Sequence, residues 1–287
     1  MSKALFLLKK TSRFLRWGFS ALRSSSLRGF TRRVAFVTGA DSSHFRSLMQ
    51  LLGSLSRNEK ASEVYCWDLG LKQSELIELT TTYPRVHLRT FDYSKFPKFF
   101  DIRVEAGQYA WKPQAINATY LELKPRLDKP ILIWVDAGNI VFRRLTWARL
   151  FASKHGVYSP FSTGTIRDWT HPRTKEHFKI DSQQELRRNS HGALIAFDLS
   201  SPIALDVLDV WAKSSLERDV IAPKGSSRKN HRQDQAVLSC ILVSRNVLPD
   251  SPYRNNWSGE HQSNCDVEKG KGLGTRWREN GRRVSLR

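Results

Sequence analysis

Short apolar runs in the central part of the chain end in Asp or Gly and lead into helical patterns. The first run, VAFVTGA at 34–40, is followed by Asp41 and then by the helix-like stretch 44–55. By the same criterion the later strands are 63–70, 86–93, 130–138 and 191–201, and the later helices are 72–83, 111–124, 202–217 and 231–245. Strands that alternate with helices of this length predict an α/β fold with a largely parallel sheet flanked by helices.

Two segments refine this prediction. The run PILIWVDAG at 130–138 is apolar at almost every position, which is typical of a strand whose sheet is covered on both faces. Residues 159–190 lack a clear period, and we expect them to form a long excursion across one edge of the sheet.

The charge of the chain is concentrated at its two ends. Lys and Arg number 47 against 27 Asp and Glu, which gives a net charge of +20, and no acidic residue precedes Asp41. The expected organisation is a basic extension at 1–32, a domain at 33–255 and a basic, poorly patterned tail at 256–287. Such charge implies an anionic partner. No nucleic-acid-binding module is recognisable, so nucleic acid is the less favoured partner.

The N-terminal extension has the pattern of a basic amphipathic helix. It is too interrupted by charge to span a bilayer, and its apolar run is shorter than the core of a signal peptide. Helical spacing places Ala4, Leu8, Leu15 and Leu22 on one face, opposite Lys9, Lys10, Arg13, Arg16 and Arg23. Such a helix suits an anionic membrane surface. A helix packed on its own domain and a disordered arm are the alternatives.

The three cysteines, Cys66, Cys240 and Cys265, are widely spaced and odd in number. This usage fits a reduced, cytoplasmic setting better than a disulfide framework. Cys66 and Cys240 lie in apolar runs, and we expect both to be buried packing residues.

Each of the first four expected strands is followed by an aspartate, namely Asp41, Asp68, Asp92 and Asp136. Ligands of open α/β sheets bind at the carboxyl ends of the strands, especially where the strand order reverses. Asp is also an ordinary turn residue, which is the simpler interpretation of Asp41, Asp68 and Asp92 taken singly. Lys112 is a further candidate for ligand binding. It lies at the N-terminus of the expected helix 111–124, where a cation and the helix dipole together favour binding of an anion.

The order of several short motifs makes the chain similar to the GT-A-type glycosyltransferases. These motifs are VTGADSSHF, YCWDLGL, YAWKP, WVDAGN, HGALIAFDL and HRQDQAVL, and they cover roughly residues 34–245. More distantly, the same order resembles the glycogenin and lipopolysaccharide galactosyltransferase group. The resemblance implies a GT-A-like fold and a nucleotide-sugar donor.

In that superfamily an Asp-x-Asp motif at a strand end holds Mn²⁺ or Mg²⁺ on the donor diphosphate. The resemblance therefore implies that Asp136 is a metal ligand or a donor contact. Gly138 stands where the second Asp would be, and Asn139 follows it. Asn139 offers an amide oxygen without charge, so metal binding stays open, and Lys or Arg side chains are the alternative source of positive charge.

The resemblance also assigns roles to the remaining motifs. It implies that Asp41 lies near the donor's base and ribose, and that Lys112 lies near its sugar–phosphate portion. His191 and Gly192 would belong to an acceptor-side strand, with Gly192 allowing close approach to the backbone. Asp234 and Gln235 would lie close to the transferred sugar. The alternatives are that His191 is a structural residue and that Asp234 complements the dipole at a helix start. His261, a later histidine, is given no role.

These inferences predict a glycosyltransferase that moves a sugar from a nucleotide-sugar to a glycan or lipid-linked acceptor hydroxyl, as in polysaccharide biosynthesis. We expect it in the cytoplasm, held peripherally at the inner membrane face by its basic extension. The alternatives are a nucleic-acid-binding protein that uses its basic termini, and a degenerate GT-A domain that binds sugar without turnover.

Overall fold

The computed structural model describes residues 33–126, 128 and 130–247, together with the backbone of 258–260, 277–279 and 282–284. The expected amphipathic helix at 1–32 lies outside the described residues. Within the described part of the chain no helix is long and apolar enough to cross a bilayer.

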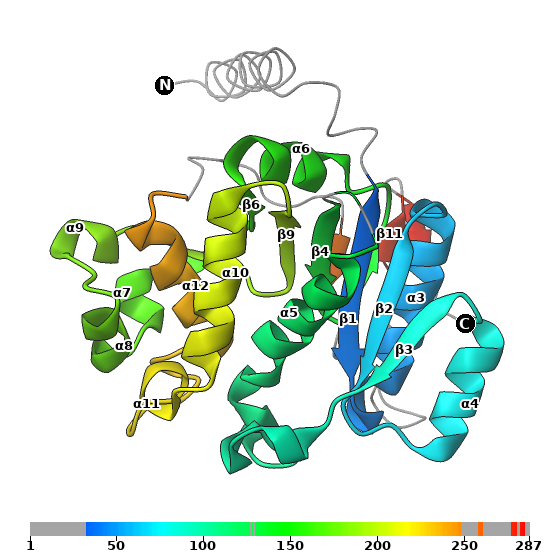
Figure 1. Cartoon of the computed structure of the whole chain (residues 1–287), viewed down its shortest axis with the longest axis horizontal. Helices are drawn as coiled ribbons and strands as arrows, with labels where there is room; N and C mark the ends of the chain where they lie inside the picture. Colours follow the sequence, from blue (N-terminus) through cyan, green and yellow to red (C-terminus); the bar gives the residue numbers. More distant parts are fainter. Residues whose placement is uncertain are drawn as a thin grey trace.

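A six-stranded sheet in the order β3-β2-β1-β4-β9-β6 forms the centre of the molecule (Figure 1). Strands β1 to β4 run parallel, whereas β9 is antiparallel to both of its neighbours. The strand bounds are β1 Val34–Ala40, β2 Glu63–Asp68, β3 Val86–Thr90, β4 Ile131–Val135, β6 Val157–Tyr158 and β9 Leu194–Asp198. The predicted α/β fold with a mostly parallel sheet is confirmed.

Helices cover both faces of this sheet, because alternate residues of its central strands point to opposite sides. Ile131, Ile133 and Val135 of β4 pack with the helices α3 (Phe45–Asn58) and α6 (Thr146–His155). All five residues of β4 are buried, as the apolar run predicted. The helix α4 (Gln73–Thr82) contributes Leu79 to a smaller cluster on the α3 side.

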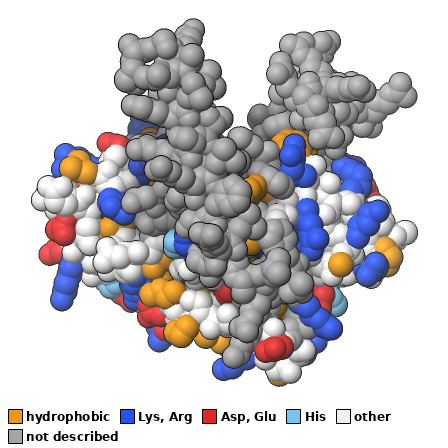
Figure 2. All heavy atoms as spheres, turned by 90° about the horizontal axis from the view of Figure 1, so that it is seen from above, with side chains coloured by type: hydrophobic (Ala, Val, Ile, Leu, Met, Phe, Trp, Pro, Cys, Tyr) orange, Lys and Arg blue, Asp and Glu red, His pale blue; other side chains and the backbone are white. Residues whose placement is uncertain are grey.

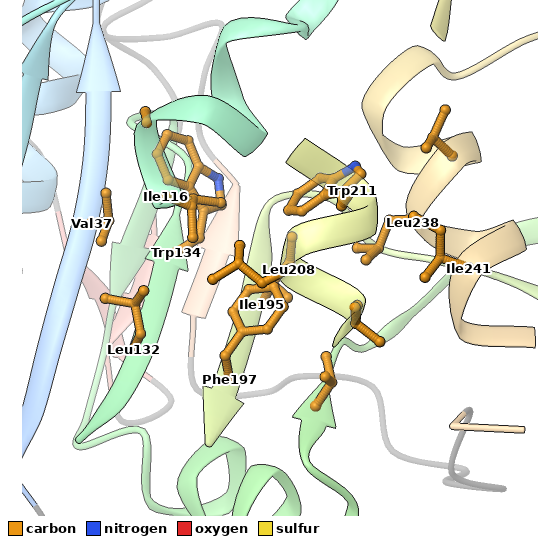
Figure 3. Packing of buried hydrophobic residues seen from close by; sticks show 14 of the residues in the cluster. Val37, Ile116, Leu132, Trp134, Ile195, Phe197, Leu208, Trp211, Leu238 and Ile241 are labelled. Carbon is orange, nitrogen blue, oxygen red and sulfur yellow. The ribbon is translucent and has the colours of Figure 1, made fainter. Parts of the chain in front are cut away.

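The opposite face of the sheet carries the largest core. Leu132 and Trp134 of β4 meet α5 (Trp111–Leu123) and α10 (Pro202–Ser215), and α12 (Gln233–Ser244) packs beyond them (Figure 3). Burying a large apolar side chain of this kind stabilises the fold by roughly 1.5–3 kcal/mol. This core fixes the N-termini of α5 and α12 relative to β4, and both helix starts carry predicted site residues.

The strand order reverses between β1 and β4. From β1 the chain builds outward through β2 and β3, and it then returns to place β4 on the other side of β1. The carboxyl ends of β1 and β4 therefore open at a topological switch point, where ligands of such sheets bind.

The structure corrects the prediction for residues 159–190, which are more regular than their sequence indicated. They form a two-stranded sheet of β7 (Phe161–Thr165) and β8 (Arg188–Ser190) that encloses three short helices. These helices are α7 (Ile166–Trp169), α8 (Pro172–His177) and α9 (Ser182–Glu185). Their starts are held by side-chain caps from Thr165, His171 and Asp181 rather than by a long apolar period.

Several further short elements were not predicted. They are α6, β5 (Asn139–Val141), β6, α11 (Arg218–Ile221) and the 3₁₀ helices η1 (Ser42–His44), η2 (Tyr93–Lys95), η3 (Lys98–Phe100) and η4 (Glu105–Tyr109). In the predicted tail, β10 (Ser258–Glu260) pairs antiparallel with β5, and β11 (Trp277–Glu279) pairs with β12 (Arg282–Val284).

The described surface carries many basic side chains, in line with the excess of Lys and Arg in the composition. On the face seen in Figure 2, Lys and Arg side chains are spread over much of the visible described surface rather than gathered in one stripe. Cys66 and Cys240 are fully buried, as predicted, and burial raises the pKa of both thiols to about 12. Cys265 lies outside the described residues.

Candidate functional site

A cavity of about 220 Å³ opens at the switch point. Its wall contains the end of β1 with Asp41, and Trp134 of β4 together with Asp136, Ala137 and Gly138 of the turn after β4. Tyr109, Trp111 and Lys112 from the start of α5 contribute another part of the wall. Two of the four strand-end aspartates, Asp41 and Asp136, therefore lie in one cavity.

A buried lysine links the predicted donor residues. The Lys112 ammonium lies 3.0 Å from Asp136 Oδ1 and 2.9 Å from Asp234 Oδ2, and its Nζ donates to the Gly192 carbonyl at 3.3 Å. Lys112 is only 3% exposed. One cation thus joins β4, the start of α12 and the segment that precedes β9.

Charge interactions inside this cluster shift two pKa values. Burial alone would lower the pKa of Lys112, but the carboxylates of Asp136 and Asp234 outweigh it and raise the pKa well above its ordinary value. Burial raises the pKa of Asp234, and the Lys112 charge only partly opposes that effect. The ammonium therefore stays protonated, and the two carboxylates together exceed its charge.

Asp136 is held in place by its neighbours but remains accessible. Trp134 Nε1 donates to Asp136 Oδ1 at 2.5 Å, and the Asp136 backbone N–H donates to the Ala193 carbonyl at 3.0 Å. Trp134 was not predicted as a site residue. Its position two residues before Asp136 was the available signal, because residues i and i+2 of a strand share a face. The Asp136 side chain is 36% exposed, which leaves it open to a ligand.

The residues after Asp136 do not complete a metal site. Gly138 has no side chain, and Asn139 is buried with its amide nitrogen 3.3 Å from the carbonyls of Asp136 and Ala193. Asn139 therefore braces the turn, because only the NH₂ group can donate to two carbonyls. Among the described residues no three His, Cys, Asp or Glu side chains gather as metal ligands. The side-chain donors that the structure describes here do not fit a divalent ion, for which several oxygen ligands are needed.

At the other end of the cavity, Asp41 forms a compact polar group. Its Oδ1 accepts from the backbone N–H and the hydroxyl of Ser43, and lies 3.2 Å from His44 Nδ1. Burial would raise the pKa of Asp41, but the hydrogen bonds from His44 and Ser43 outweigh it and hold the pKa below its ordinary value. A charged acceptor with a neighbouring imidazole can hydrogen-bond sugar hydroxyls.

The other two strand-end aspartates act as turn residues. Asp68 Oδ1 accepts from the backbone N–H groups of Gly70 and Leu71, at 2.8 and 2.7 Å. Asp92 Oδ1 accepts from the backbone N–H and the hydroxyl of Ser94. Neither residue is part of the described cavity wall, so the simpler interpretation holds for both.

The structure brings Gly192, Asp234 and Gln235 together behind the cavity wall. A Cβ atom at Gly192 would lie 3.3 Å from Gln235 Cβ and 3.4 Å from Asp234 Oδ2. The close approach at this glycine is therefore made by the start of α12. His191 is held by its backbone between Ser159 and Pro160. The described cavity wall does not include His191, and its acceptor-side role stays a prediction.

A left-handed turn closes one side of the cavity. The residues from Glu105 to Tyr109 all have φ between 47° and 58°, a conformation that costs about 1–2 kcal/mol for each residue other than glycine. Gly107 is required within it, because a Cβ there would lie 2.2 Å from the Phe100 carbonyl oxygen. Trp111 Nε1 donates to the Ala106 carbonyl and holds the turn against α5. Strain of this kind concentrates at functional sites.

Comparison with protein families finds one match. Residues 20–117 match a family described as a protein of unknown function, DUF1647, over less than half of the chain. No curated protein sequence matches the chain.

Several glycosyltransferases are among the solved structures to which the chain is similar. The WbbM bifunctional glycosyltransferase is 16% identical with a TM-score of 0.48, over 75% of this chain and 38% of that one. The galactosyltransferase LgtC, solved with donor and acceptor sugar analogs, is 15% identical with a TM-score of 0.41, over 72% and 70%. Mouse xyloside xylosyltransferase 1 is 10% identical with a TM-score of 0.41, over 76% and 83%. The chain thus spans less than half of WbbM.

Proposed function

We propose that the protein is a glycosyltransferase that moves a sugar from a nucleotide-sugar donor to a hydroxyl of a glycan or lipid-linked acceptor. One observation carries the proposal: a single switch-point cavity joins Asp41 at the end of β1 to the cluster of Lys112, Asp136 and Asp234. The motifs that resemble the GT-A enzymes supply these same residues.

The chemistry of the cavity suits the two ends of such a donor. Asp41 would accept hydrogen bonds from the ribose hydroxyls, and Asp136 would accept them from the transferred sugar. Asp234 and Gln235 lie behind Asp136, where Asp234 would orient the sugar through its contact with Lys112. The hydrogen bonds from sugar hydroxyls to these carboxylates would be charge-assisted, which makes them stronger than neutral ones.

The excess negative charge of the cluster also suits the reaction. In the transfer, the bond between the sugar C1 and the diphosphate oxygen breaks, and its electron pair leaves with the nucleoside diphosphate. The acceptor oxygen forms the new bond to C1 and gives its proton to the departing diphosphate or to water. Positive charge that develops on the sugar is stabilised by two carboxylates which share one ammonium.

Nucleotide and nucleotide-sugar binding tests the proposal directly. We would titrate UDP-, GDP- and dTDP-sugars and follow saturation-transfer NMR or the thermal unfolding midpoint. Asp136→Asn should weaken donor binding about ten- to hundredfold, the loss expected for a charge-assisted hydrogen bond. The matched control is Asp92→Asn, which changes a strand-end aspartate that only caps its own turn, and it should leave the affinity unchanged.

The outcomes separate the alternatives. Donor binding with neither transfer nor hydrolysis would favour a degenerate sugar-binding domain. Binding to DNA or RNA that falls steeply with salt, without any donor binding, would favour the nucleic-acid alternative. For location we keep the proposal of a cytoplasmic protein on the inner membrane face, which vesicles with and without anionic lipid would test on the full chain and on a chain that lacks residues 1–32.

A further inference from the structure

The departing nucleoside diphosphate of the proposed reaction needs positive charge beside it. In metal-dependent transferases a divalent ion supplies that charge. The source of charge in this protein is therefore a separate question, which rests on the proposed function.

The turn after β4, residues 136–139, offers too few ligands for a metal ion. Asp136 Oδ1 already accepts from Trp134 and lies against Lys112, the Asn139 amide nitrogen faces two carbonyls, and Gly138 adds no ligand. One remaining carboxylate oxygen is a weak site for an ion that takes six or more oxygen ligands.

Lys112 cannot take the place of the metal on the diphosphate. Its ammonium already lies 3.0 and 2.9 Å from the carboxylates of Asp136 and Asp234, and it donates to the Gly192 carbonyl at 3.3 Å. Since those two carboxylates exceed its charge, the cluster repels a diphosphate more than it attracts one.

A second cation contacts Tyr109, a residue of the cavity wall. Arg228, exposed in the loop between α11 and α12, donates from Nη1 to the Tyr109 hydroxyl at 2.8 Å. Its guanidinium carbon lies 5.6 Å from the centre of the Tyr109 ring, and Lys112 Nζ lies 5.7 Å from that same ring. Tyr109 lines the cavity, so one aromatic ring links the buried cation to Arg228.

The loop that carries Arg228 is internally braced. The Ser227 backbone N–H donates to Asn230 Oδ1 at 2.7 Å, and Asn230 Nδ2 donates to the Gly225 carbonyl at 3.1 Å. His231 at its end is fully buried and lies 2.9 Å from the Ile221 carbonyl through Nε2. The loop therefore presents Arg228 from a fixed base, beside the strained turn that positions Tyr109.

We propose that Arg228 binds the diphosphate of the donor and supplies the positive charge that a divalent ion supplies in metal-dependent transferases. A guanidinium suits this task, because it binds phosphate oxygens in a bidentate fashion and does not lose its proton. Among the described residues, Tyr109 takes one of its five N–H donors, and a diphosphate would take others. Binding of the nucleoside diphosphate then does not require a metal.

The test compares nucleotides that differ only in their phosphates. With EDTA present, the affinities of UDP and uridine are measured by calorimetry on the full chain, and GDP with guanosine or dTDP with thymidine extends the panel. Arg228→Ala should weaken the diphosphate about ten- to hundredfold and leave the nucleoside unchanged. Arg228→Lys should recover part of the loss. Lys229→Ala, which removes the neighbouring exposed cation, is the matched control and should have no effect.

Metal dependence provides a readout that does not need activity. Replacing EDTA by MnCl₂ should leave the diphosphate affinity unchanged, and the electron paramagnetic resonance signal of free Mn²⁺ should be the same with the unmodified protein and with Asp136→Asn. A tenfold gain with Mn²⁺, or Mn²⁺ binding lost in Asp136→Asn, would overturn the inference and leave the proposed function standing. Equal affinity of Arg228→Ala and the unmodified protein would do the same. Failure of every nucleotide to bind the unmodified protein would overturn both.

Discussion

Two buried cations in this protein have very different surroundings. Arg149 of α6 pairs with Glu59 at the end of α3, and their side chains are 3% and 1% exposed. Glu59 also accepts from the Leu145 backbone N–H at 2.7 Å. Lys112 is equally buried, but it faces two carboxylates, and one of them, Asp136, is 36% exposed toward a cavity.

The difference shows which feature of a buried ion pair indicates function. The pair of Arg149 and Glu59 is balanced in charge and sealed from solvent, so it can only join α3 to α6. The Lys112 cluster has two carboxylates for one ammonium, and it is open to the cavity at Asp136. Both properties allow it to bind a ligand. Burial of a charge alone is weak evidence for a site.

The largest effect is expected at the sealed pair. Arg149→Met leaves the Glu59 carboxylate buried without a neutralising charge, which should lower the free energy of unfolding by about 3–5 kcal/mol. Urea denaturation measures this change. Adding Glu59→Gln should recover much of the loss, because the uncompensated charge is removed. Nucleotide binding by the folded fraction should not change, and a loss of binding would mean that the sealed pair also supports the site.

A smaller loss of stability is expected at the open cluster. Lys112→Met should cost about 1–3 kcal/mol, because Asp136 can be hydrated from the cavity and Asp234 can take up a proton. The same variant should lose donor binding, which Arg149→Met keeps. If Lys112→Met lowers the free energy of unfolding in urea as much as Arg149→Met does, the contrast between an open and a sealed charge is wrong.

The smallest effect is expected in the pH dependence of the free energy of unfolding. Burial raises the pKa of Asp234 above its ordinary value, so between the two pKa values the native state holds a proton that the unfolded chain has released. Stability should therefore fall as the pH rises from about 4 toward the raised pKa, by up to about 1.4 kcal/mol per pH unit. Asp234→Asn should remove this slope.

Asp92→Asn is the matched control for that slope. The hydrogen bonds from Ser94 hold the pKa of Asp92 below its ordinary value, so this carboxylate contributes stability that is lost as the pH falls. Its removal should change the pH dependence in the opposite direction, and only below about pH 4. Identical pH profiles for Asp234→Asn and the unmodified protein, in urea unfolding at pH 4 to 7, would contradict the raised pKa of Asp234.

The fold could be predicted where local pattern and burial agree. The strands β1 to β4 and β9 and the helices α3, α4, α5, α10 and α12 follow from apolar runs of the right period. The pattern failed for α6, where Trp147, Arg149 and His155 obscure the apolar face, although Arg149 is buried by its pairing with Glu59. It failed again for α7 to α9, which have only four to six residues, are held by caps and are too short for a period to develop.

Three of the predicted site residues, Asp41, Lys112 and Asp136, line the cavity, but the contacts they make could not be predicted. Asp41 and Asp136 were expected at strand ends, and the structure places both in one cavity. Lys112 was expected to face phosphate because it sits at a helix N-terminus, whereas its ammonium faces Asp136 and Asp234. Asn139 was expected as a ligand, and its amide instead braces the turn.

By itself the sequence determined the alternation of strands and helices, the excess of basic residues, and the single carboxylate that ends the most apolar strand, because these depend only on residue order. The tertiary structure decided which side chains share a charge. Placing β4 beside β1 and α12 behind β9 brings Asp136 and Asp234 to the same ammonium, and places Arg228 beside Tyr109. Electrostatic interactions fall off with distance through space, and the distance between such residues is set by the packing of the sheet and its helices.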